Sequence, residues 1–123
     1  MNMILGLRTA IYPAPDLVHA KTWYAQVLDQ APYFDEPYYV GFEVGGFELG
    51  LIPDGAPGVT GCVAYWGVPD AAAELARLLN LGAELREDTH DVGGGIKVAS
   101  VLDPFGNAFG VIENPHFDRT KVG

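Results

Sequence analysis

One pattern of strands and a helix occurs twice along the 123 residues and limits the folds that the chain can adopt. In each copy, a strand-like apolar run is followed by a Pro-Asp step, an amphipathic helix and three further strands. The first copy spans residues 4–52 and the second spans residues 61–115, with a Pro- and Gly-rich linker at 53–60 and a tail at 116–123. The pattern predicts an α+β chain of two βαβββ modules within one domain, residues 1–115.

The limits of the expected elements follow from local signals. Asp16 and Asp70 each directly follow a proline and are expected to cap helices at residues 16–30 and 70–82. The second helix is expected to stop at Gly82. Strands are expected at 6–13, 33–36, 38–44 and 47–52 in the first module, and at 62–68, 83–90, 96–102 and 108–113 in the second.

A two-residue turn at Gly45-Gly46 allows one hairpin register to be predicted. It pairs Gly41 with Gly50 and Glu43 with Glu48. Because side chains alternate along a strand, one face is apolar and should pack against a helix: Val40, Phe42, Val44, Phe47, Leu49 and Leu51. The other face carries Tyr39, Gly41, Glu43, Glu48, Gly50 and Ile52. Two opposed glycines predict that this second face is empty at its centre, as a surface open to solvent or as the floor of a cavity.

The last strand of the second module repeats the glycine. Gly110 in "FGVI" stands where Gly50 stands in "LGLI", and it shares a face with Ala108 and Ile112. Alternation in residues 62–68 places Tyr65 on the same face as Val63. Tyr39 and Tyr65 are therefore the aromatic residues that we expect beside a cavity, where their rings can stack and their hydroxyls can fix a polar group.

The Glu43–Glu48 pair is a like-charge pair directly across two strands, which is unfavourable unless it is hydrated or matched by a cation. Two interpretations stay open. The pair either lies at the wet end of the hairpin, or it holds a cationic ligand or acts as acid and base.

Composition excludes several classes of function. Sixteen acidic residues against seven basic ones leave a formal charge of −9, which disfavours binding to nucleic acid or to an anionic membrane surface. No apolar run reaches membrane-spanning length, and the first residues lack the features of a signal peptide. The single cysteine, Cys62, allows no internal disulfide and is typical of a cytoplasmic protein.

Two motifs, "PDLVHAKTWYAQVLD" at 15–29 and "DPFGNAFGVIENP" at 103–115, occur within this repeated plan. Together they resemble the vicinal oxygen chelate superfamily, which includes glyoxalase I, extradiol dioxygenases, fosfomycin-modifying enzymes and bleomycin-resistance proteins. The resemblance covers residues 4 to 115. It implies that each module curls into half of a cup-shaped sheet with its helix on the outer face.

Enzymes of that superfamily hold a divalent metal on the first and last strands of each module. The resemblance maps these positions onto Thr9 (or Arg8), Val63, Gly50 and Gly110. Glycine and valine offer no donor, and threonine or arginine does not replace a neutral imidazole. The three histidines and Cys62 show no recognised ligand spacing either. We therefore expect no metal and no cofactor.

The resemblance, together with the missing ligands, implies a non-catalytic protein that binds a small aromatic or cationic molecule, as a homodimer that sequesters a drug or metabolite. The residues expected to line the ligand site are Tyr39, Gly41, Glu43, Glu48, Gly50, Val63, Tyr65 and Gly110. The alternatives are a lyase or isomerase of the same superfamily, using an unrecognised metal or Glu43 as a metal-free base, and an accessory domain without a specific ligand.

Overall fold

The chain divides into two compact units that adjoin in sequence between Ala56 and Pro57. The structure is a computed structural model, and it describes residues 7–58 and 63–116. Cys62, the first residue of the strand predicted at 62–68, lies outside the described residues.

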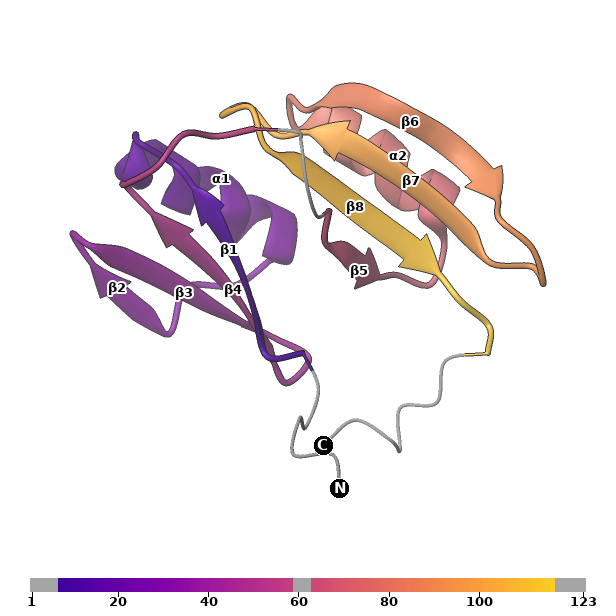
Figure 1. Cartoon of the computed structure of the whole chain (residues 1–123), viewed down its shortest axis with the longest axis horizontal. Coiled ribbons are helices and arrows are strands. Elements are labelled where there is room, and N and C mark those ends of the chain that lie inside the picture. The colour runs from indigo at the N-terminus through magenta and orange to yellow at the C-terminus, as the bar shows by residue number, and fades with distance from the viewer. Residues whose placement is uncertain (1–6, 59–62, 117–123) are drawn as a thin grey trace. The chain divides into compact units, whose positions relative to one another are not determined.

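Unit 1 has one helix and a four-stranded sheet (Figure 1). Its elements are β1 (Thr9–Pro13), α1 (Leu17–Leu28), β2 (Phe34–Glu36), β3 (Tyr39–Val44) and β4 (Phe47–Ile52). The strand order is β1-β4-β3-β2, with β1 parallel to β4 and the other pairs antiparallel.

Unit 2 repeats this topology. Its elements are β5 (Tyr65–Gly67), α2 (Ala71–Asn80), β6 (Glu84–Asp91), β7 (Lys97–Leu102) and β8 (Ala108–Glu113). The order is β5-β8-β7-β6, again with the first strand at one edge of the sheet and parallel to the last strand, which is interior. The prediction of an α+β chain with two βαβββ modules is confirmed, and neither four-stranded sheet closes on itself.

Both helices begin at the predicted aspartates. The Asp16 carboxylate accepts a hydrogen bond from the His19 backbone N–H at 3.2 Å, and that of Asp70 accepts one from Ala73 at 3.1 Å. The second helix is followed by Gly82 at φ +105°, as expected of a glycine stop. The first helix ends differently, because Asp29 adopts the left-handed conformation at φ 53°, which short polar side chains tolerate.

The β3–β4 hairpin has the predicted register from Val40–Leu51 to Val44–Phe47, with Gly41 opposite Gly50. Its apolar face packs against α1, and Phe42, Leu49 and Leu51 are fully buried there. Near the turn the prediction is less accurate, since Val44 and Phe47 are only half-buried.

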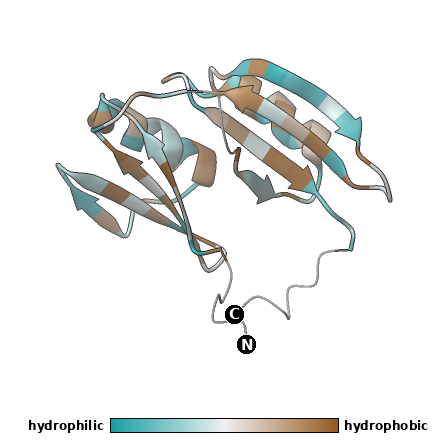
Figure 2. Ribbon diagram, in the orientation of Figure 1, coloured by the Kyte–Doolittle hydropathy of each residue, from teal (hydrophilic) through white to brown (hydrophobic). Residues whose placement is uncertain are grey.

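The core of unit 2 lies between its sheet and α2. Leu75 and Leu78 of the helix are buried with Val101 of β7 and Val111 of β8. Trp66 stacks on Phe109 with ring centroids 6.5 Å apart. Figure 2 shows the contrast within this sheet, where central β8 is mainly hydrophobic and edge strand β6 is mainly hydrophilic. Charged side chains on an edge strand discourage pairing with another chain.

His116, the first residue of the predicted tail, contacts the segment between β6 and β7, since its Nε2 lies 2.6 Å from the Gly94 carbonyl oxygen. Among the residues that the structure describes, no helix is long and apolar enough to cross a membrane.

The β7–β8 turn depends on Asp103, which is buried at 4% exposure. One of its carboxylate oxygens accepts hydrogen bonds from the backbone N–H groups of Phe105, at 2.9 Å, and Asn107, at 2.8 Å. The carboxylate therefore organises the Asp-Pro-Phe-Gly-Asn turn by replacing backbone partners that a strand would have supplied.

We expect Asp103→Ala to lower the free energy of unfolding by about 2–4 kcal/mol, because it leaves two N–H groups without an acceptor. Asp103→Asn keeps one acceptor oxygen and should lose clearly less. Urea denaturation of both variants provides the measurement. Equal losses in the two would show that the acceptor oxygen is not what holds the turn.

Candidate functional site

The Glu48 carboxylate on β4 collects hydroxyl groups from three other segments. Thr9 Oγ1 on β1 donates to Glu48 Oε1 at 2.6 Å, and the Tyr39 hydroxyl on β3 donates to the same oxygen at 2.8 Å. The Tyr33 hydroxyl, from the segment before β2, donates to Oε2. Because β4 lies between β1 and β3, the sheet order itself brings these donors to one carboxylate. We call Thr9, Tyr33, Tyr39 and Glu48 the Glu48 cluster.

The hydrogen bonds set the charge state of the cluster. The pKa of Glu48 is lowered, first by the Thr9 hydrogen bond and then by that of Tyr33, and these effects exceed the opposing effect of burial. Burial and the neighbouring carboxylate raise the pKa of Tyr39 to about 12, and the hydrogen bond to Glu48 raises that of Tyr33. At neutral pH the cluster therefore holds one carboxylate and two neutral phenols.

The negative charge of Glu48 has no cationic partner within the described part of the chain. The ion pairs there involve His19, Lys21, Arg77 and Arg86. The hydroxyl donors stabilise the carboxylate without neutralising it. The cluster thus keeps a full negative charge available to a ligand.

Aromatic rings surround this charge. The Phe34 ring on β2 lies edge-on to Tyr38 and Tyr39, with centroid distances of 6.1 and 6.0 Å. Tyr33 and Tyr38 are largely exposed, at 65% and 64%. The result is a group of aromatic rings that adjoins the carboxylate through the hydroxyls of Tyr33 and Tyr39.

The two opposed glycines lie beneath this cluster, and the expectation of an empty centre is wrong. A Cβ at Gly50 would lie 2.8 Å from Cζ of Tyr39, and one at Gly41 would lie 2.7 Å from Glu48 Oε2. The Cβ at Gly41 would also lie 3.2 Å from Tyr33 Cε1 and 3.2 Å from Tyr39 Cε2. The glycines leave room for aromatic rings that rest directly on the backbone, rather than for an open cavity.

The same arrangement occurs in unit 2. Tyr65 is directly opposite Gly110 in the parallel β5–β8 register, and a Cβ at Gly110 would lie 2.5 Å from Tyr65 Cδ1 and 2.9 Å from the Ala64 carbonyl oxygen. Val63 lies half-buried just before β5 and is not part of that strand. Among the predicted site residues, the structure therefore groups Tyr39, Gly41, Glu48 and Gly50 in unit 1, and Tyr65 with Gly110 in unit 2.

Glu43 does not join the Glu48 cluster. It is opposite Glu48 in the register, as predicted, but its carboxylate accepts a hydrogen bond from the Gly46 backbone N–H at 2.7 Å. The like-charge pair is thereby separated, with one carboxylate at the hairpin turn and the other beneath the tyrosines. The part of Glu43 in ligand binding stays a prediction.

Sequence reasoning missed Tyr33 and Phe34 as members of this surface. The register contains a signal for Phe34, which is opposite Gly41 and therefore shares its face. No local pattern indicates that Tyr33, which precedes the strand, reaches Glu48.

The residues present do not fit the metal site of the superfamily. In the parallel register Thr9 is opposite Glu48, whereas Gly50 is opposite Ile11, so the carboxylate stands two residues before the position mapped from the resemblance. The Thr9 hydroxyl donates a hydrogen bond to that carboxylate. Within residues 7–58 and 63–116, no group of three or more His, Cys, Asp or Glu side chains is placed to hold a metal ion.

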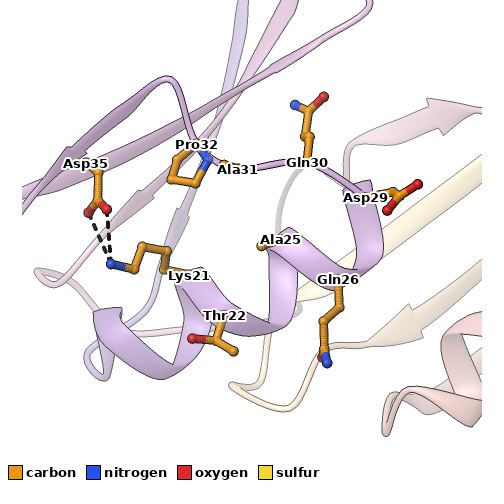
Figure 3. A pocket seen from close by; sticks show the side chains of 9 residues that line it. All are labelled: Lys21, Thr22, Ala25, Gln26, Asp29, Gln30, Ala31, Pro32 and Asp35. Carbon is orange, nitrogen blue, oxygen red and sulfur yellow. Dashed lines mark hydrogen bonds and ion pairs between the residues drawn. The ribbon is translucent and has the colours of Figure 1, made fainter.

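A surface depression of about 550 Å³ runs along α1 (Figure 3). Lys21 forms an ion pair with Asp35 at 3.0 Å, and the Gln30 amide donates to the Glu43 carbonyl oxygen. In Figure 3 the side chains of Gln26, Asp29 and Gln30 point away from the Lys21–Asp35 pair and do not converge. The depression lies along the helix, whereas the Glu48 cluster is on the opposite face of the sheet. It therefore offers no comparable site.

We expect Glu48→Gln to change how the free energy of unfolding depends on pH in acid. Because the folded-state pKa of Glu48 lies below its usual value, its ionisation stabilises the fold above about pH 4.5, and this contribution is lost as pH falls through the lowered pKa. The difference in unfolding free energy between wild type and the variant should thus be present at pH 7 and shrink in acid. Glu84→Gln, at an exposed edge-strand position, is the control. A difference for Glu48→Gln that is constant from pH 7 to strong acid would contradict the assignment.

Gly110→Ala should destabilise the chain by about 1–3 kcal/mol, because its methyl group would collide with the Tyr65 ring and with backbone. Gly67→Ala in the same unit has open space around its Cβ and should cost nothing. Adding Tyr65→Ala to Gly110→Ala should restore part of the loss. Chemical denaturation of the four proteins tests this contact, and equal stability of the two glycine variants would refute it.

No protein-family model matches the chain, and no curated protein matches it by sequence. Solved structures match it closely in three dimensions. A glyoxalase-related enzyme from Fulvimarina pelagi superimposes with a TM-score of 0.74 at 18% identity, over 91% of this chain and 90% of that one. A lactoylglutathione lyase from Agrobacterium tumefaciens gives 0.72 at 22% identity, over 92% and 98% of the two chains. A member of the glyoxalase/bleomycin resistance protein/dioxygenase superfamily from Sphaerobacter thermophilus gives 0.71 at 19%, over 92% and 100%. The resemblance drawn from the sequence is therefore confirmed at the level of structure, and this chain has the fold of the glyoxalase/bleomycin resistance/dioxygenase superfamily.

Proposed function

We propose that this chain is a metal-free small-molecule binding protein of the glyoxalase/bleomycin-resistance type, which sequesters an aromatic or cationic drug or metabolite in the cytoplasm. The observation that carries the proposal is the Glu48 cluster, in which an ionised carboxylate without a cationic partner in the described residues lies among aromatic rings. The proposal includes a homodimer, as the superfamily resemblance implies.

The chemistry of the cluster favours an organic cation. The faces of aromatic rings attract a cation by about 0.5–2 kcal/mol for each contact, depending on how well water is excluded. The Glu48 carboxylate at the hydroxyl ends of Tyr33 and Tyr39 adds direct charge attraction, and the formal charge of −9 attracts cations from a distance. Tyr33 and Tyr38, being largely exposed, offer ring surface to an incoming ligand.

The rival function is that of a lyase or isomerase that uses an unrecognised metal or Glu43 as a metal-free base. Glu43 lies outside the Glu48 cluster, so the base that the cluster itself would offer is Glu48. A general base works best when its pKa is near the working pH, which for a glutamate requires a raised pKa. The pKa of Glu48 is shifted the other way, and Tyr39, with a pKa of about 12, is a weak acid at neutral pH. The cluster is better suited to holding charge than to moving protons. The similar structures are called a lyase in one case and a glyoxalase-related enzyme in another, and at these identities they support the fold alone.

The proposal predicts that benzyltrimethylammonium binds and that Glu48→Gln weakens this binding by about tenfold or more, because a carboxylate–cation contact is lost. Isothermal titration calorimetry measures both. Glu84→Gln makes the same change in net charge at an exposed position in unit 2 and should bind like wild type.

Three results would contradict the proposal. The first is no binding of the cation by wild type, and the second is equal weakening by Glu48→Gln and Glu84→Gln. The third is a stoichiometric divalent metal in the purified protein that is lost in Glu48→Gln, which would favour the enzyme. Metal analysis of the two proteins measures this last point.

A further inference from the structure

A single row of residues crosses the sheet of unit 2. Tyr65 is opposite Gly110, Gly110 is opposite Ser100, and Ser100 is opposite Glu87. Directly opposed residues share a face, and their neighbours Val101, Phe109 and Val111 are buried on the side of α2. The row therefore lies on the other face of the sheet, with its smallest residues in the middle.

An irregularity in β6 brings Arg86 to this row. Leu85 is opposite Val101 while Glu87 is opposite Ser100, so two steps along β6 match one step along β7. Arg86 is the extra residue of this β-bulge, and a bulge redirects a side chain that regular alternation would send to the opposite face. Arg86 Nη1 donates to Ser100 Oγ at 3.1 Å and to Glu87 Oε1 at 2.6 Å. Adjacent residues of a regular strand point to opposite faces, so this contact depends on the bulge.

The guanidinium is anchored rather than free. Ser100 is buried at 1% exposure, and its hydroxyl accepts from Arg86 and donates to Glu87 at 3.3 Å. Both hydrogen bonds of the guanidinium to these partners come from Nη1, and the side chain remains 29% exposed. The N–H groups of Nε and Nη2 form the planar fork that binds a carboxylate through two parallel hydrogen bonds.

The neighbouring position in the row supplies an aromatic surface. The Tyr65 ring rests on Gly110, the residue next to Ser100 across the sheet, and it is 42% exposed. Adjacent strands are about 4.8 Å apart, so the ring and the anchored guanidinium stand over neighbouring strands. Within the described residues of unit 2 the other cations are Arg77, which is paired with Glu74 on α2, and Lys97, which alternates onto the α2 side of β7.

We propose that Arg86 and Tyr65 form a binding site for the carboxylate of a small planar acid, with the carboxylate on the Arg86 fork and the planar group against the Tyr65 ring. Ser100 and Glu87 position the guanidinium. This site goes beyond the proposed function, since it lies on the other unit and takes the opposite charge to the Glu48 cluster.

Benzoate is the probe, and NMR of the full chain is the measurement. Titration should shift the Arg86 Nε–H and Tyr65 ring signals together, with one saturable dissociation constant. Arg86→Gln should weaken benzoate binding by about tenfold or more, because a charged hydrogen-bonding partner is removed. Arg86→Lys keeps the charge but not the fork and should also bind more weakly than wild type. Arg77→Gln on α2 is the matched control and should bind benzoate like wild type.

Benzamide, a neutral analogue of the same shape, keeps the test decisive if the Arg86 variants fold poorly. Wild-type protein should bind benzamide at least about tenfold more weakly than benzoate, since benzamide lacks the charge for the fork. Equal binding of the two would overturn the proposal, as would unchanged benzoate affinity in a folded Arg86→Gln, or no shift at Arg86 and Tyr65. Benzoate binding should survive Glu48→Gln, and benzyltrimethylammonium binding should survive Arg86→Gln, so failure of one site leaves the other standing.

Discussion

The register of the β3–β4 hairpin is the constraint on which the candidate site in unit 1 depends. Gly45 and Gly46 both adopt positive φ, at 59° and 93°, and so permit the two-residue turn that places Gly41 opposite Gly50. A slip of one residue would move every side chain to the other face of the sheet. Phe42 and Leu49 would leave the core, and Glu48 would be buried against α1. The burial of those two apolar residues therefore also holds Glu48 on the face where the hydroxyl groups meet it.

In both units a tyrosine ring rests on a glycine of the last strand, but the rings come from different strands. Tyr39 belongs to β3 and reaches Gly50 diagonally, with its hydroxyl held by Glu48. Tyr65 belongs to the first strand of unit 2 and covers its direct partner Gly110. The repeated topology thus keeps the small residue while the chemistry beside it diverges. One face presents a carboxylate with hydroxyl donors, and the other presents an anchored arginine. This divergence is why we assign ligand groups of opposite charge to the two faces.

The accuracy of prediction from sequence followed the range of the interactions involved. Helix starts at Asp16 and Asp70 depend on contacts three residues away, and both were predicted. The hairpin register depends on a two-residue turn and was also predicted. The prediction of an empty centre above Gly41 and Gly50 was wrong. Alternation gives the face on which a side chain lies, but not the direction in which its ring then turns. The β6 bulge at Arg86 was missed for a related reason, since Glu84–Asp91 contains no glycine or proline to mark it.

Hydrophobic periodicity, capping and turn chemistry are local properties, so the repeated α+β plan, the core faces and the residue types available for function can be predicted from the amino-acid sequence. Which of those residues act together depends instead on contacts between distant segments. Thr9 and Glu48 are 39 positions apart, and the β1–β4 pairing alone makes them neighbours. The same applies to Arg86 and Ser100, which meet through a bulge between two strands. Such contacts arise from strand order and side-chain rotamers, which are set when distant segments pack and which no short stretch of sequence specifies.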